Sequence, residues 1–107
     1  MNKINPTKQS LINEICLMAN LGETFKLLRG SSIPIQFFQK LERRFSIPIA
    51  NGMEVKAETF CNYFGIEWTS DCDSSSSPSG GGGTVTKIGL LKIKEAVQIA
   101  IEKESID

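Results

Sequence analysis

The apolar positions of the chain recur mostly at helical spacing, and the first such segment follows Thr7. Thr7 can cap a helix, because its side-chain oxygen accepts a hydrogen bond from the first turn. Gly22 is expected to end this helix, and a short second helical piece is expected at "ETFKLL", residues 23–28. The apolar stripe of the first helix consists of Leu11, Ile12, Ile15, Met18 and Ala19.

The segment "IPIQFFQKLERRF", residues 33–45, predicts an amphipathic helix. Pro34 is tolerated in a first helical turn, and Ser32 upstream is a candidate cap. The polar side carries Gln36, Lys40 and Arg43, with Arg44 nearer its margin. The apolar side carries Ile35, Phe37, Phe38, Leu41 and Phe45.

Two further helices are predicted towards the C-terminal end. "MEVKAETFCNYFG" begins at Met53 and ends at Gly65, after which Ile66 and Trp68 are expected to fold back onto it. Thr86 is expected to cap the last helix. No segment predicts a convincing strand, and no internal repeat is present. The inward positions are Ala57, Phe60, Cys61 and Phe64 in the first of these helices and Leu90, Ile93, Val97, Ala100 and Ile101 in the second.

Between these two helices lies a Ser/Gly-rich run, which is predicted to be a flexible loop over residues 70–83. The helix after it carries an apolar stripe, and such a helix is unstable alone in water. It must therefore pack on the helices before the loop, so the loop lies inside one domain. The sequence predicts an all-α fold, a single helical domain over residues 1–107 with four to five helices and a long Ser/Gly-rich loop before the last.

Charge is unevenly distributed although the formal net charge is zero. Residues 1–49 hold seven basic residues against three acidic ones, and residues 50–79 hold one against five. No signal-peptide pattern and no apolar run of the ~20 residues that a membrane span needs is found. The three cysteines are therefore expected as free thiols in a cytoplasmic protein that contacts no membrane.

Enzymatic chemistry is not expected of this chain. It contains no histidine, which excludes Ser-His-Asp and Cys-His arrangements, and the cysteines lack the spacing of a zinc site. No cofactor and no metal are predicted. The glycine run also differs from a nucleotide-binding loop, because Lys87 follows Thr86 instead of preceding it.

Two groups of residues suit contact with a nucleic acid. Lysine and arginine neutralise phosphates, while glutamine and arginine can read base edges. On these residues alone a plainer interpretation is favoured for each group: a solvated helix face for the first and a flexible tip with a simple helix cap for the second. The first group is Arg29, Ser31, Ser32, Gln36, Gln39, Lys40, Arg43 and Arg44, and the second is Thr84, Thr86 and Lys87.

Three short motifs occur in order along the chain: Gly30-Ser31-Ser32 before the proline-started helix, Gly65-Ile66-Glu67-Trp68, and Gly83-Thr84-Val85-Thr86 with Gly89-Leu90. Through them the chain resembles the small N-terminal helical module that precedes the nuclease core in some bacterial type II restriction endonucleases. The resemblance implies a DNA-recognition module of a restriction-modification or genome-defence protein, with double-stranded DNA and a nuclease domain or subunit as partners.

The alternative is a protein–protein interaction or dimerisation domain with no role in nucleic-acid binding. Salt separates the two, because phosphate-driven binding weakens steeply as salt rises and hydrophobic docking barely responds.

Overall fold

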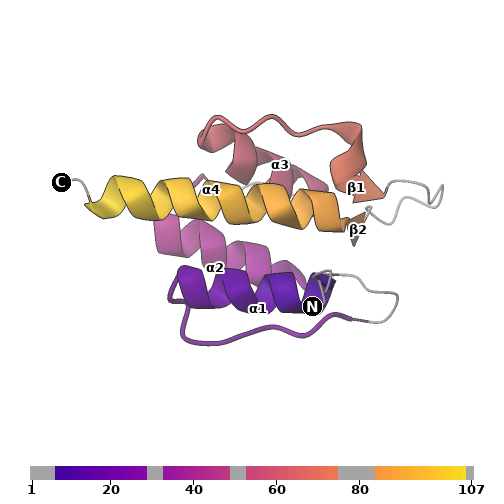
Figure 1. Ribbon diagram of the computed structural model, residues 1–107, viewed down its shortest axis with the longest axis horizontal. Coiled ribbons are helices and arrows are strands. Elements are labelled where there is room, and N and C mark those ends of the chain that lie inside the picture. Colours follow the sequence, from indigo (N-terminus) through magenta and orange to yellow (C-terminus); the bar gives the residue numbers. More distant parts are fainter. Residues whose placement is uncertain (1–6, 29–32, 49–52, 75–83, 106–107) are drawn as a thin grey trace, which may run out of the picture.

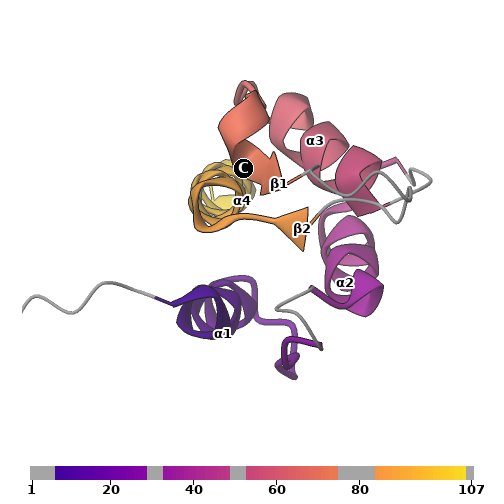
Figure 2. The ribbon, with the colours of Figure 1, turned by 90° about the vertical axis from the view of Figure 1, so that its right-hand side faces the viewer.

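The computed structural model of the chain describes residues 7–28, 33–48, 53–74 and 84–105, with the backbone alone at 53–55, 73–74, 84 and 105. Four α-helices make up most of these ranges: α1 (Lys8–Met18), α2 (Ile35–Phe45), α3 (Met53–Tyr63) and α4 (Lys87–Ser105). α4 is the longest and packs on both α1 and α3, while α2 packs on α3 (Figure 1). Figure 2 shows α4 end-on, with the other three helices beside it. The predicted all-α bundle is confirmed.

Helix α1 begins at the predicted cap. The Ser10 amide donates to the Thr7 hydroxyl over 3.0 Å, and the Thr7 amide donates to the Ser10 hydroxyl over 3.0 Å, so each side chain satisfies a backbone group of the other residue. The helix ends earlier than predicted, at Met18, because Asn20 adopts a left-handed conformation (φ 57°) before Gly22 (φ 84°) is reached.

The helical piece predicted at residues 23–28 is wrong, because the described backbone there is not helical. The side-chain amide of Gln9 donates to the Phe25 carbonyl over 2.7 Å and accepts from the Leu27 amide over 2.9 Å, which gives this segment the partners a neighbouring strand would supply. Its burial also alternates: Phe25 and Leu27 are half-buried, while Thr24, Lys26 and Leu28 are exposed. This period of two is typical of an extended segment, and the sequence shows it as polar Thr24 and Lys26 alternating with apolar Phe25 and Leu27.

The remaining helix ends follow the predicted signals where they are described. α2 has Pro34 at its cap position without a side-chain hydrogen bond, and the candidate cap Ser32 lies outside the described residues. α3 is followed by Gly65 with φ 83°, and the Ile66 amide then donates to the Cys61 carbonyl over 2.9 Å. The predicted stop at Gly65 and the return of Ile66 onto α3 are therefore confirmed.

Part of the predicted loop 70–83 is regular structure. Ser70–Cys72 form the 3₁₀ helix η2, and strand β1 (Asp73–Ser74) pairs antiparallel with strand β2 (Thr84–Val85). Residues 75–83 lie outside the described residues. Two-residue strands are too short to leave an alternating pattern, so periodicity alone could not predict them. The hairpin brings β2 to the start of α4, where the Thr86 hydroxyl accepts from the Gly89 amide over 3.3 Å as the predicted cap.

The core is formed by the apolar stripes of all four helices, closed by Ile33, Ile47, Ile66 and Val85 from the connecting segments. Cys16 and Cys61 are both buried in it, and for Cys61 this confirms the predicted inward position. The largest side chains almost fully withdrawn from solvent are Phe37, Phe38, Phe60, Leu11, Ile12, Ile15, Ile33, Leu41, Leu90 and Ile93.

Adjacent leucines of α4 test this assignment. Leu90 is fully buried and Leu91 is 45% exposed, so Leu90→Ala should lower the free energy of unfolding by roughly 2–5 kcal/mol. Leu91→Ala should change it by less than about 0.5 kcal/mol. Chemical denaturation of both variants measures the difference. Similar losses would show that α4 is packed through another face.

Gly89 provides a second test, because it lies in the first turn of α4 against the hairpin. A Cβ atom here would collide with the Cys72 carbonyl oxygen and lie 2.7 Å from a methyl group of Val85. Alanine normally stabilises a helix interior relative to glycine by roughly 0.5–1 kcal/mol, but Gly89→Ala should destabilise the domain by roughly 1–3 kcal/mol. Gln98→Ala, on the exposed face of α4, is the control. A gain in melting temperature for Gly89→Ala would contradict the close approach of η2, β2 and α4.

Candidate nucleic-acid interface

The outward face of α2 carries four of the predicted nucleic-acid contacts. Gln36, Gln39 and Arg43 are exposed, and Lys40 is partly exposed. Residues three and four apart in a helix are neighbours on one side, so these amide and cationic side chains form one surface. We call these four residues the α2 face.

The α2 face is hollowed. Its four residues line a shallow depression of about 220 Å³ together with Glu23 and Phe25. Within it, the Lys40 ammonium forms an ion pair with the Glu23 carboxylate over 2.9 Å. The depression therefore has one cation that a carboxylate of the same chain already neutralises.

Arg43 lies where three depressions meet. It lines the one just described, a second of about 210 Å³ beside Asn20 and Leu21, and a third of about 100 Å³ beside Gln39 and Lys56. Within the described ranges, Arg43 forms no ion pair with a carboxylate. It is the cation of the α2 face best placed to meet an anion from outside.

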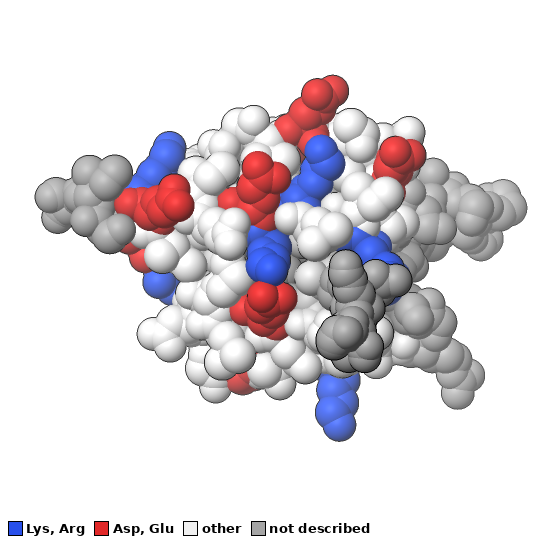
Figure 3. Space-filling model, in the orientation of Figure 1, with Lys and Arg blue, Asp and Glu red and all other residues white. Residues whose placement is uncertain are grey.

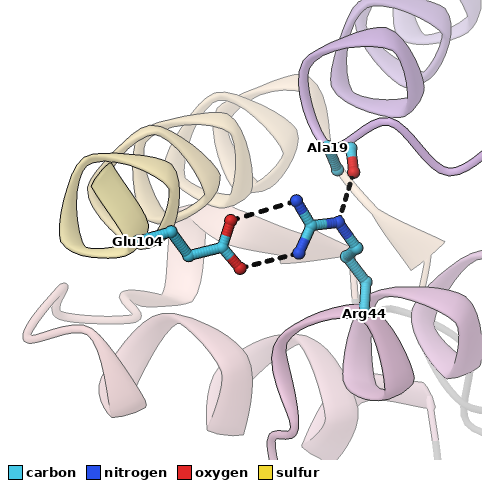
Figure 4. Close-up of polar contacts among 3 residues, drawn as sticks. All are labelled: Ala19, Arg44 and Glu104. Carbon is cyan, nitrogen blue, oxygen red and sulfur yellow. Dashed lines mark hydrogen bonds and ion pairs between the residues drawn. The ribbon is translucent and has the colours of Figure 1, made fainter. Parts of the chain in front are cut away.

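Arg44, the next residue, is engaged within the fold (Figure 4). Its guanidinium donates to both carboxylate oxygens of Glu104 over 2.7 and 3.0 Å, and its Nε donates to the Ala19 carbonyl over 2.6 Å. The guanidinium also lies 4.6 Å from the centre of the Phe45 ring. Arg44 thus links the ends of α1, α2 and α4, and these donors are not available to a phosphate. We call this group of contacts the Arg44 clasp.

The Arg44 clasp changes the pKa of the Glu104 carboxyl. Hydrogen bonds from the Arg44 guanidinium lower the pKa of the Glu104 carboxyl below its usual 4.5. A carboxylate held in its charged form contributes stability above its usual pKa and loses that contribution as the pH falls through the lowered value.

A buried ion pair, which the sequence analysis missed, lies on the inner side of the α2 face. The Lys56 ammonium of α3 contacts both carboxylate oxygens of Glu42 over 3.1 and 3.2 Å, and each side chain is only 5% exposed. Helical spacing could have indicated this pair. Glu42 lies four residues after Phe38 and Lys56 lies four before Phe60, so each shares a side of its helix with a core phenylalanine. Glu42 therefore points into the interface with α3, while Gln39 and Arg43 border the pair on the exposed side of the helix.

The second predicted group lies at the opposite end of α4. Thr86 and Lys87 are at its start, whereas Glu104, which holds Arg44, is near its end, and a helix of 19 residues is about 28 Å long. The Thr86 hydroxyl donates to the Asp71 carbonyl over 2.6 Å, so its proton is already used. The structure does not bring Arg44 together with Thr86 and Lys87. Arg29, Ser31, Ser32 and the side chain of Thr84 lie outside the described residues.

Charge is mixed over the surface that Figure 3 shows, where basic and acidic side chains adjoin one another without a continuous basic area. Lys94 of α4 and Glu14 of α1 form an ion pair over 2.9 Å. The surface in this view therefore shows no large basic area of the kind that attracts DNA.

Other chemistry has little support in the described residues. Burial raises the pKa of Cys16 to about 11 and that of Cys61 to about 12, so both thiols stay protonated and unreactive at neutral pH. Across the described ranges, no three His, Cys, Asp or Glu side chains gather as metal ligands would. Among the helices described, none combines the length and the apolar character that crossing a bilayer requires.

Comparisons of the chain with protein-family models, with curated proteins and with solved structures give no match. Its function is therefore inferred from the residues and their geometry.

The two neighbouring arginines should differ in their effect on stability. Arg44→Ala should lower the melting temperature by several degrees at neutral pH, because it removes the contacts that join three helices. Arg43→Ala should leave it unchanged, because exposed charges contribute little to folding. The deficit of Arg44→Ala should shrink as the pH falls from 4.5 through the lowered pKa of Glu104, because the wild-type carboxylate is protonated there and the ion pair is lost. Thermal melts at several pH values measure this, and equal melting temperatures at neutral pH would contradict the clasp.

Proposed function

We propose that this chain is a non-catalytic DNA-binding module that contacts the backbone of double-stranded DNA through the α2 face. The observation that carries the proposal is Arg43: an exposed arginine, without a carboxylate partner in the described ranges, beside Gln36, Gln39 and Lys40 on one helix. The resemblance to the N-terminal modules of restriction endonucleases points to the same class, and under it the chain serves a restriction-modification or genome-defence protein.

The chemistry of the α2 face suits a groove lined by phosphates. Arginine and lysine neutralise phosphate oxygens, and glutamine can form paired hydrogen bonds with adenine in the major groove, which is wide enough for an α-helix. Gln36 and Gln39 lie on the same side of α2 as Arg43, so phosphate and base contacts would come from one surface. Phosphate contacts position a protein on the duplex, and base contacts supply specificity.

The proposed affinity is modest. Of the three α2 cations, Lys40 and Arg44 are each paired with a carboxylate, so Arg43 is the one without such a partner in the described ranges. Each neutralised phosphate steepens the dependence of affinity on salt by roughly one unit in log–log form. Contact with one or two phosphates would give weak binding by the isolated chain, with a nuclease domain or subunit supplying the rest.

One observation favours a second candidate, a protein-interaction module. Ile88 and Leu91, one helical turn apart on α4, are 46% and 45% exposed, and Leu17 on α1 is 78% exposed. Such side chains suit a partner protein. Association through them would be insensitive to salt and to the substitution of Arg43, so the same titrations separate the two functions.

Arg43→Ala should weaken binding to a mixed-sequence duplex at low salt and reduce the slope of log affinity against log salt by about one unit, because one phosphate contact is lost. Fluorescence anisotropy with a labelled duplex measures both quantities. Lys103→Ala, which removes another exposed cation on α4, is the matched control and should change neither. Absence of binding by the wild-type protein, or the same loss from both variants, would contradict a DNA contact through α2.

A further inference from the structure

Glu23 is placed beside the α2 face by the backbone before it and by a contact after it. It follows the chain reversal at Asn20 and Gly22, both of which have positive φ. Two residues later, the Phe25 carbonyl is bound by the Gln9 side chain over 2.7 Å.

Phe25 also fixes this segment to α2. Its ring packs edge-on against that of Phe37 with the centroids 6.1 Å apart. Glu23 is therefore tied to both α1 and α2, and its carboxylate is presented to Lys40 by the fold and not by a freely moving tail.

The Glu23 carboxylate occupies the place that an incoming phosphate would take. It contacts the Lys40 ammonium over 2.9 Å inside the depression that Gln36, Gln39 and Arg43 also line. Both groups are partly exposed, so the pair is accessible to a competing anion and is weak, as exposed ion pairs are.

We propose that Glu23 is an internal competitor for phosphate at Lys40, and that it restricts the α2 face to ligands with several linked phosphates. This inference rests on the proposed DNA contact through α2. An isolated phosphate that meets Arg43 gains little by displacing Glu23. A duplex that is already held at Arg43 presents neighbouring phosphates at high effective concentration, and one of them can replace the carboxylate. Glu23 then moves into water, and Lys40 becomes a second phosphate contact.

The proposal predicts an acidic residue whose removal improves binding. Glu23→Gln keeps the size of the side chain and removes its charge, so Lys40 is freed for DNA. Exposed ion pairs of this kind contribute about 0.2–1 kcal/mol, so the affinity for a mixed-sequence duplex should rise by a factor of roughly 1.5–5. The slope of log affinity against log salt should change little, because Lys40 contacts phosphate in both bound complexes.

The matched control is Glu14→Gln. Glu14 also pairs with a lysine over 2.9 Å, and its side chain is 50% exposed, as is that of Glu23. The substitution changes the net charge by the same amount, but Glu14 lies on α1 and contacts Lys94 of α4. A general effect of net charge would appear in both variants, whereas competition at Lys40 appears only in Glu23→Gln.

The experiment is an anisotropy titration of the full chain with a labelled duplex, for the wild type, Glu23→Gln, Glu14→Gln, and Lys40→Ala alone and combined with Glu23→Gln. The proposal is supported if Glu23→Gln tightens binding, Glu14→Gln does not, and the gain disappears when Lys40 is alanine. It is overturned if Glu23→Gln leaves the affinity unchanged, or if the gain persists without Lys40 or is matched by Glu14→Gln.

The same titrations distinguish the role of Glu23 from the proposed DNA contact through α2. Duplex binding by the wild type that Arg43→Ala weakens, without a specific gain in Glu23→Gln, overturns the role of Glu23 alone. No duplex binding by either the wild type or Glu23→Gln overturns both.

Discussion

The buried ion pair between Glu42 and Lys56 is the constraint on which the arrangement of α2 depends. Removing a carboxylate and an ammonium from water costs several kcal/mol for each ion, and only close mutual contact offsets that cost. Their atoms meet at 3.1 and 3.2 Å between α2 and α3. Any rotation of α2 that separated them would leave two buried charges without this contact, so the pair fixes which side of the helix faces α3.

The orientation of α2 determines where its other polar and charged side chains lie. With Glu42 directed inward, Gln36, Gln39 and Arg43 are directed to solvent. Arg44 follows Arg43 by about 100° around the helix and meets Glu104 and the Ala19 carbonyl. The two adjacent arginines thus have different roles. Arg44 joins helices, and Arg43 is exposed to solvent. The proposed function depends on this division.

The helices could be predicted because local chemistry specified them. Thr7 and Thr86 cap as expected, Gly65 follows α3 with positive φ, and the apolar stripe of α4 is buried. Residues 23–28 were wrongly predicted as a helix because their hydrogen-bond partner is the distant Gln9. The alternation of polar and apolar residues in this segment was the available sign of an extended backbone.

Side-chain partners were harder to predict than helices. The ion pair of Glu42 and Lys56 left a trace in helical spacing, because both residues fall on apolar stripes. The partners of Lys40 and Arg44 left none, since Glu23 and Glu104 are brought near them only by the packing of separate elements. A basic helix face read from sequence therefore overstated the charge available for phosphate.

The buried pair holds α2 with Gln36, Gln39 and Arg43 exposed to solvent, and the proposed contact with DNA depends on that orientation. The most direct test is a titration of the isotopically labelled protein with a mixed-sequence duplex, followed residue by residue by NMR. The account predicts that shift changes concentrate at Gln36, Gln39, Lys40 and Arg43, with Ile88 and Leu91 unaffected. Changes centred on Ile88 and Leu91, or no changes at low salt, would contradict it.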